Sequence, residues 1–170
     1  FFFNNFSKFF HNPFNRFLSA TQFGTYPGYS GSFPSVAGTV SVHGDNGDSS
    51  LAYSWDFTGV DTGCVPNAGA EAGIANGCGV HVHSGKSCLD ASLVGGHFYT
   101  GASDPWSPIQ YTVDSGSTVA RGSATVDSGK SFADMLGRAF VVHDASGARI
   151  SCGIVEEFQS LSAELFQPYP

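Results

Sequence analysis

Apolar and polar residues alternate along much of the chain from residue 36 onward, which is the pattern of half-buried β-strands. The alternating or apolar stretches are 36–42, 51–57, 79–83, 109–113, 119–126 and 138–143. Turns rich in Gly, Ser, Asp or Asn separate these stretches. Many short strands with such turns are typical of an antiparallel sandwich or barrel. We therefore expect one all-β domain over residues 35–155.

The first 34 residues follow a different pattern and are predicted to form a Phe-rich arm. Ten of the 16 Phe residues lie between Phe1 and Phe33. Apolar residues recur at three- and four-residue spacing, which predicts one face of a helix. These residues are Phe3, Phe6, Phe10, Phe14, Phe17 and Leu18. Residues 23–34 are rich in Gly, Tyr, Pro and Ser and are predicted to be an irregular linker.

So many Phe side chains favour burial, since each buried Phe contributes about 1.5–3 kcal/mol. The arm can pack on its own domain, on a second copy of the chain, or on a membrane surface. A closed β domain already covers its own core, so we favour self-association through the arm. Residues 156–170 are expected to form a helical turn followed by a tail.

Composition and charge exclude two classes of partner. The 22 Gly residues and a charged fraction of only 12% suit a turn-rich β fold. The net charge is −7 and there is no basic run, which argues against nucleic-acid binding. No apolar stretch of about 18 residues is present, so we expect no transmembrane helix.

Four cysteines are present, and their irregular spacing without a Cys-x-x-Cys pair makes a structural zinc finger improbable. They are Cys64, Cys78, Cys88 and Cys152. Four free thiols in a cytosolic protein remain the alternative to two disulfides. The even count and the Ser-, Gly- and Thr-rich composition favour disulfides and a secreted, extracellular protein.

Four histidines form the candidate metal site. His81 and His83 are separated by one residue, so on a strand both imidazoles face the same side. His97 follows two glycines that permit a sharp bend, and His143 ends the apolar run 139–142. Imidazole ligands suit copper and also zinc, so this chemistry leaves both metals open.

Four segments resemble, in the same order, elements of the copper/zinc superoxide dismutases. They are Cys-Gly-Val-His-Val-His at 78–83, Gly-Gly-His-Phe-Tyr at 95–99, Gly-Arg-Ala-Phe-Val-Val-His-Asp at 137–144 and Gly-Ala-Arg-Ile-Ser-Cys-Gly at 147–153. The resemblance covers about residues 36–155. It implies a Greek-key β-barrel or sandwich in which the four histidines hold copper. It also implies that Arg149 guides superoxide and that Cys88 pairs with Cys152. Cys64 and Cys78 have no counterpart in the family's typical cytosolic enzyme, and the remaining two cysteines are expected to form a second bridge.

One departure from that family concerns zinc. No histidine lies between His97 and His143, so the family's zinc site cannot be assembled. The chain thus looks like the extracellular copper-only superoxide dismutases, which implies one copper per chain, no zinc, and conversion of superoxide to O2 and hydrogen peroxide. Asp104 and Asp114 are candidates for a carboxylate that contacts a ligand imidazole.

Two alternatives stay open. The chain can instead be a structural subunit of an extracellular assembly or filament, with an idle or structural copper site. Arg149 can be a surface strand residue that pairs with a carboxylate rather than a catalytic residue.

Overall fold

The computed structural model describes residues 17–33, 36–45 and 47–158. Over these residues the chain forms nine strands and three short helices. The strands are β1 (Phe17–Ala20), β2 (Gly24–Thr25), β3 (Ala37–His43), β4 (Ser50–Thr58), β5 (Val80–His83), β6 (Ala120–Asp127), β7 (Ala139–His143), β8 (Arg149–Ile154) and β9 (Glu156–Phe158). The helices are η1 (Gly69–Ala72), α1 (Ala91–Val94) and η2 (Phe132–Met135). The expected all-β class is confirmed.

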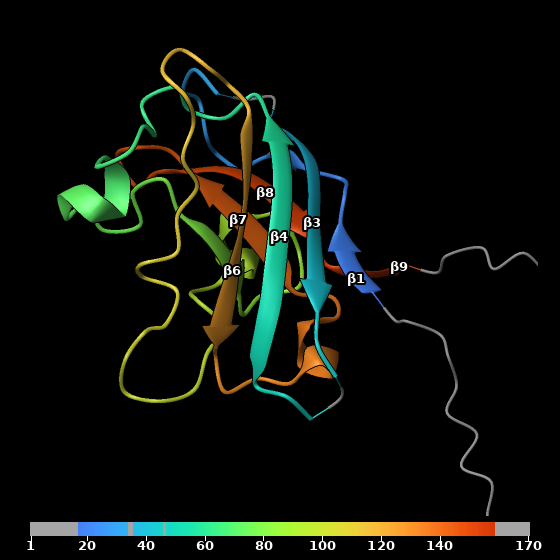
Figure 1. Cartoon of the computed structure of the whole chain (residues 1–170). Coiled ribbons are helices and arrows are strands. Elements are labelled where there is room, and N and C mark those ends of the chain that lie inside the picture. The colour runs from blue at the N-terminus through green and yellow to red at the C-terminus, as the bar shows by residue number, and fades with distance from the viewer. Residues whose placement is uncertain (1–16, 34–35, 46, 159–170) are drawn as a thin grey trace, which may run out of the picture.

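The strands form two antiparallel sheets that lie face to face, as Figure 1 shows. The larger sheet has the order β6-β4-β3-β1-β9, and the smaller sheet has the order β2-β8-β7-β5. Strand β4 shows why the sequence folds this way, because its apolar residues alternate with polar ones and only the apolar face is buried. Those buried residues are Leu51, Tyr53, Trp55 and Phe57. They contribute to the main hydrophobic core, together with valines of β5 and β7.

Both faces of the smaller sheet are covered. Every residue of β5 and β7 is buried, although neither strand is wholly apolar. One face packs in the main core. The other face carries a second, small apolar cluster, which consists of Tyr26, Val94, Ala139, Val141 and Cys152. The histidines of β5 and β7 lie on this second face, because side chains alternate along each strand.

Several local predictions are corrected. Phe17 and Leu18 lie in strand β1 rather than in a helix, since β1 pairs with both β3 and β9. The helical prediction for Phe3, Phe6, Phe10 and Phe14 lies outside the described residues. Pairing with β1 likewise makes Glu156–Phe158 a strand rather than a helical turn.

Residues 109–113 form no strand, apart from one isolated bridge between Gln110 and Gly79. Strands β1 and β2 belong to the two sheets even though they lie within the segment 1–34. Among the helices of the described residues, none is long and apolar enough to cross a membrane.

Candidate metal centre

The structure brings together the four histidines that the sequence singled out. One ring nitrogen of each lies within 4.8 Å of the corresponding atoms of the others, and we call this group the four-histidine cluster: His81, His83, His97 and His143. Strand β5 supplies two members and the end of β7 supplies a third. His97 reaches the cluster from the loop between β5 and β6, where it forms an isolated bridge with His83.

Each histidine of the cluster uses one ring nitrogen to bond an oxygen of the protein. His81 Nε2 lies 3.0 Å from the Ile109 carbonyl, and His83 Nδ1 lies 3.0 Å from the Gly95 carbonyl. His143 Nδ1 lies 2.9 Å from the carbonyl oxygen of residue 147, and His97 Nδ1 lies 2.6 Å from Asp104 Oδ2. These oxygens only accept, so the bonded nitrogen carries the hydrogen and the other nitrogen has a free lone pair.

Three of those free nitrogens are buried without a hydrogen-bond partner among the residues that the structure describes. They are His81 Nδ1, His83 Nε2 and His143 Nε2. Unpartnered buried acceptors are costly, and a metal ion would satisfy all of them at once. Two nitrogens at about 2.1 Å from one ion lie at most about 4.2 Å apart, so the observed separations need little adjustment. The residues therefore fit a metal ion held by imidazoles.

Burial keeps these imidazoles neutral, as metal ligands must be. It lowers the pKa of His83 to about 3 and the pKa of His143 to about 4. Burial also places the pKa of His81 well below its usual range, and the neighbouring histidines add to that effect. The site is thus ready for a cation at neutral pH without releasing protons from these three rings.

Two glycines lie beside the imidazoles, and only the first makes room for a ring. A Cβ on Gly79 would lie 2.3 Å from Cε1 of the His81 ring, so only glycine leaves space for that ring. Gly95 has a φ of +73°, and its carbonyl accepts from His83. A Cβ there would lie 2.4 Å from Ser84 Oγ. Both positions therefore require glycine on steric grounds.

A turn at residues 104–108 holds His97. Asp104 accepts from His97 through Oδ2 and from the Trp106 backbone N–H through Oδ1, at 2.9 Å. The Trp106 indole in turn donates to the Phe98 carbonyl at 3.0 Å. The predicted carboxylate contact is therefore made by Asp104. Asp114 forms no hydrogen bond with an imidazole of the cluster in the part of the chain that the structure describes.

Both disulfides are present. Cys88–Cys152 joins the loop that leads to His97 to strand β8. Cys64–Cys78 joins the loop after β4 to the residue two positions before β5. The Cys78 N–H donates to the Asp144 carbonyl at 2.7 Å, which ties the start of β5 to the residue after His143.

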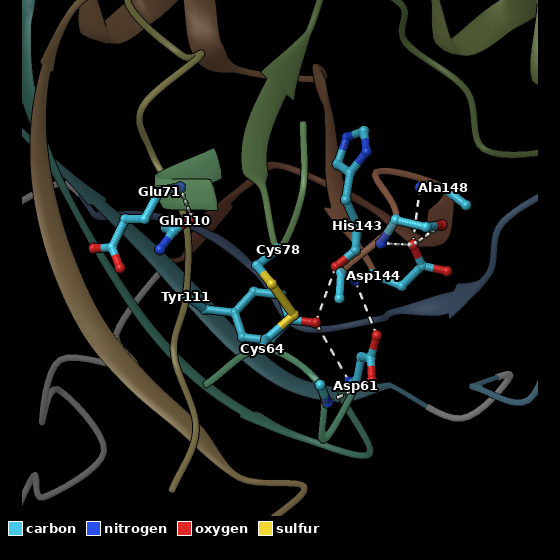
Figure 2. Close-up of a disulfide and its surroundings, with 12 residues drawn as sticks. Asp61, Cys64, Glu71, Cys78, Gln110, Tyr111, His143, Asp144 and Ala148 are labelled. Carbon is cyan, nitrogen blue, oxygen red and sulfur yellow. Dashed lines mark hydrogen bonds between the residues drawn. A yellow bond between two sulfur atoms is a disulfide. The ribbon is translucent and has the colours of Figure 1, made fainter. Parts of the chain in front are cut away.

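Figure 2 shows a buried hydrogen-bond network beside the Cys64–Cys78 bridge. The Tyr111 hydroxyl lies between two backbone groups: it donates to the His143 carbonyl at 2.9 Å and accepts from the Asp61 N–H at 3.3 Å. The Asp61 carboxylate accepts from the Ala145 N–H at 2.9 Å. The backbone that follows His143 is thus fixed by groups from the loops before and after β5.

Arg149 lies next to the cluster. It pairs with His143 across strands β7 and β8, and its charge acts on both His83 and His143. Its Nη1 donates to the hydroxyl of Tyr26 at 2.8 Å. Among the described residues the salt bridges join His97 to Asp104 and Arg121 to Asp56, so the expected alternative of a carboxylate partner for Arg149 is not seen there.

Sequence reasoning missed two contributors to this centre. Tyr26 lies in the segment assigned to a linker, and Tyr111 lies in a segment assigned to a strand. No sequence signal marks either tyrosine, because each reaches its partner through a contact between residues far apart in the chain. His43 lies at the end of β3, where its ring packs edge-on against Phe17 at 5.2 Å, outside the cluster.

No protein-family model matches the chain, and no curated protein is significantly similar to it. The fold and the site therefore define the class: an all-β, disulfide-bonded protein whose four-histidine cluster can hold a metal ion.

Proposed function

We propose that this protein is a secreted, copper-only superoxide dismutase with a Greek-key β fold of the superoxide dismutase type. The observation that carries the proposal is the set of three buried, unpartnered imidazole nitrogens that converge with His97 on one point. An all-nitrogen donor set suits copper in both of its common oxidation states. The four segments that resemble copper/zinc superoxide dismutases include every member of this set and Arg149.

The reaction converts two superoxide ions and two protons to O2 and hydrogen peroxide. A bound copper ion would supply the one-electron exchange. The chain's residues hold the ion and attract the substrate. Arg149 offers a positive charge that persists at every relevant pH, which offsets the repulsion expected from a net charge of −7.

His97 differs from the other three ligands in its surroundings. Its side chain is 10% exposed, whereas each of the three other histidines is, as a whole residue, at most 1% exposed. Asp104 holds the hydrogen of its Nδ1, so its Nε2 stays available for a metal. We infer that His97 is the exchangeable ligand and that the open side of the site lies beside it.

The test is metal analysis combined with superoxide decay on the purified full chain. We expect about one copper per chain and rapid decay of superoxide, measured by stopped flow. His83→Ala should abolish both copper retention and decay, because it removes a buried ligand. His43→Ala is the matched control, since His43 lies outside the cluster. A chain that binds no copper, or binds copper without activity, would contradict the proposal.

Zinc competition separates the two metals that imidazole chemistry leaves open. The chain is loaded in an equimolar mixture of both ions, and the bound metals are then measured. Copper retention in excess of zinc supports the proposal, whereas preferential zinc binding contradicts it.

A structural role in an extracellular assembly is the second candidate. One observation favours it: a groove on the outer face of β1 and β3 is lined by Phe17, His43 and Phe158 together with serines and threonines. This groove begins where the Phe-rich residues 1–16 join β1. Because β1 and β2 are part of the sheets, the test deletes residues 1–16 only. Light scattering should show a smaller assembly after the deletion, and an unchanged mass rules out assembly through the arm.

A further inference from the structure

Tyr26 connects three parts of the molecule that surround the metal centre. Its backbone N–H donates to the Ile150 carbonyl at 3.0 Å, next to Arg149 in strand β8. Its hydroxyl accepts from Arg149 Nη1 at 2.8 Å and lies 3.5 Å from the Ala91 carbonyl of helix α1. The side chain is buried in the small apolar cluster on the histidine-bearing face of the smaller sheet. Tyr26 is therefore held in place and can restrict the movement of the flexible Arg149 side chain that contacts it.

The contact between Tyr26 and Arg149 has two components. The hydroxyl accepts a charge-assisted hydrogen bond, and the ring lies beneath the guanidinium, with Cζ 5.6 Å from the ring centroid. Both components restrict the rotation of a long side chain. Without them Arg149 would lose a substantial amount of conformational entropy whenever it bound a ligand.

The Tyr26 hydroxyl that contacts Arg149 carries no charge, and this determines what the guanidinium can bind. A carboxylate would hold the guanidinium equally well, but it would cancel the positive charge. The phenol hydroxyl is neutral, so it orients Arg149 and leaves its charge available to an anion. Only one of the five guanidinium N–H groups is needed for this contact, and the others remain as donors.

We propose that Tyr26 is a positioning residue that holds the Arg149 guanidinium beside the four-histidine cluster, where it binds a small anion at the metal. The inference rests on the proposed function for the identity of the metal and of the anion. Tyr26 acts through Arg149 and does not contact the metal.

The test uses the full chain loaded with copper(II) and titrated with azide, a small anion whose binding to copper changes the visible absorption. Arg149→Gln should weaken azide binding by about tenfold, because it removes the charge. Tyr26→Phe should weaken it by about three- to tenfold, because it removes the hydrogen bond and keeps the ring. Tyr26→Leu should weaken it at least as much, because it removes both contacts.

Two controls separate positioning from general damage. Tyr29→Phe makes the same chemical change in the same loop, at a hydroxyl with no hydrogen bond to Arg149 in the described part of the chain, and should leave azide affinity unchanged. Tyr26→Phe should have no further effect in an Arg149→Gln background. The copper(II) electron paramagnetic resonance spectrum should be the same in all variants, since the ligands are untouched.

A second readout needs no metal. In the metal-free protein, nitrogen-15 NMR of the arginine side chains should show hindered rotation of the Arg149 guanidinium, and Tyr26→Phe should release it. Unchanged rotation together with unchanged azide affinity in both Tyr26 variants would overturn the proposal, and so would an altered copper spectrum.

Failure of this inference and failure of the proposed function give different results. If the copper-loaded chain does not consume superoxide but the azide and NMR results are as expected, the positioning role stands and the dismutase activity does not. If superoxide is consumed but azide affinity is insensitive to Arg149→Gln, Arg149 does not bind the anion and the inference is wrong.

Discussion

At the scale of single residues, each imidazole of the cluster is oriented by the oxygen that accepts its ring N–H. That contact leaves its other ring nitrogen free to bind a metal. Three of these oxygens are backbone carbonyls, and the fourth belongs to the Asp104 carboxylate. A carboxylate that accepts from Nδ1–H of a ligand imidazole fixes its orientation and strengthens its other nitrogen as a metal donor. His97 is therefore expected to be a stronger donor to the metal than its greater exposure alone would suggest.

Asp104→Asn should weaken copper binding by about tenfold, because the amide oxygen can still accept from His97 but carries no charge. Competition with a chelator of known affinity measures this effect. Asp114→Asn is the control, since it removes a carboxylate of the same loop that contacts no imidazole of the cluster. Equal losses of copper affinity from the two substitutions would mean that copper binding depends only on the net charge of the loop.

The stability of the metal-free protein should depend on pH in the acidic range. An unfolded histidine takes up a proton near pH 6.5, whereas the folded protein resists protonation of His83 and His143 down to about pH 3 and about pH 4. The unfolded state therefore binds more protons between these limits, and the free energy of unfolding falls as the pH falls below 6.5.

Urea unfolding of the chelator-treated protein between pH 7.5 and pH 5 measures this dependence. The slope can reach about 1.4 kcal/mol per pH unit for each buried histidine. A stability that is constant over this range would show that the rings are not held neutral by the fold.

At the scale of elements, irregular segments rather than strands complete the site. The segment 109–113 forms no strand, yet it supplies the Ile109 carbonyl to His81 and the Tyr111 hydroxyl to the backbone of His143. Its own backbone remains bonded, because the Tyr111 N–H donates to the Cys78 carbonyl at 2.9 Å. A loop can thus support a metal ligand as firmly as a strand when its polar groups are satisfied.

Tyr111→Phe should destabilise the protein by about 1–3 kcal/mol, because it leaves two buried backbone groups without their partner. Tyr53→Phe is the matched control. Tyr53 is equally buried, but its hydroxyl has no hydrogen-bond partner within the described ranges. Removing that hydroxyl should therefore be neutral or stabilising. Denaturant unfolding of both variants measures their free energies of unfolding. Similar losses of stability in the two variants would contradict this prediction.

At the scale of the whole molecule, the two disulfides connect loops to the sheet that carries the histidines. Cys88–Cys152 spans 64 residues and Cys64–Cys78 spans 14. In the chain-entropy model the longer bridge restricts the unfolded chain more strongly. It also holds the loop that delivers His97 and the Ala91 carbonyl against strand β8.

Cys88→Ala/Cys152→Ala should therefore lower the free energy of unfolding by about 4 kcal/mol, and Cys64→Ala/Cys78→Ala by about 3 kcal/mol. Only the first pair should also weaken azide binding to the copper-loaded protein, because it frees the loop that packs on Tyr26. Unfolding curves and azide titrations check both statements. A larger stability loss for the shorter bridge would contradict the entropic ordering.

The sequence by itself predicted the all-β class and grouped the four histidines. Alternation of apolar and polar residues is a local property, and it was sufficient for β3, β4 and β6. The His81–Val82–His83 pattern was sufficient to predict that the two histidines lie on the same face of a strand, because side chains alternate strictly along a strand. The pairing of Cys88 with Cys152 followed from the resemblance rather than from the spacing, and Cys64 and Cys78 were then the remaining pair.

The tertiary structure decided what local patterns cannot encode. Phe17 and Leu18 fit a helical face, yet pairing with β3 and β9 makes them a strand, because hydrogen bonds to distant strands outweigh a weak local preference. Tyr26 meets Arg149 across 123 residues of sequence. The four histidines were visible in the sequence, but the oxygens that orient them and the hydroxyl that holds Arg149 come from distant segments, so only the folded chain determines them.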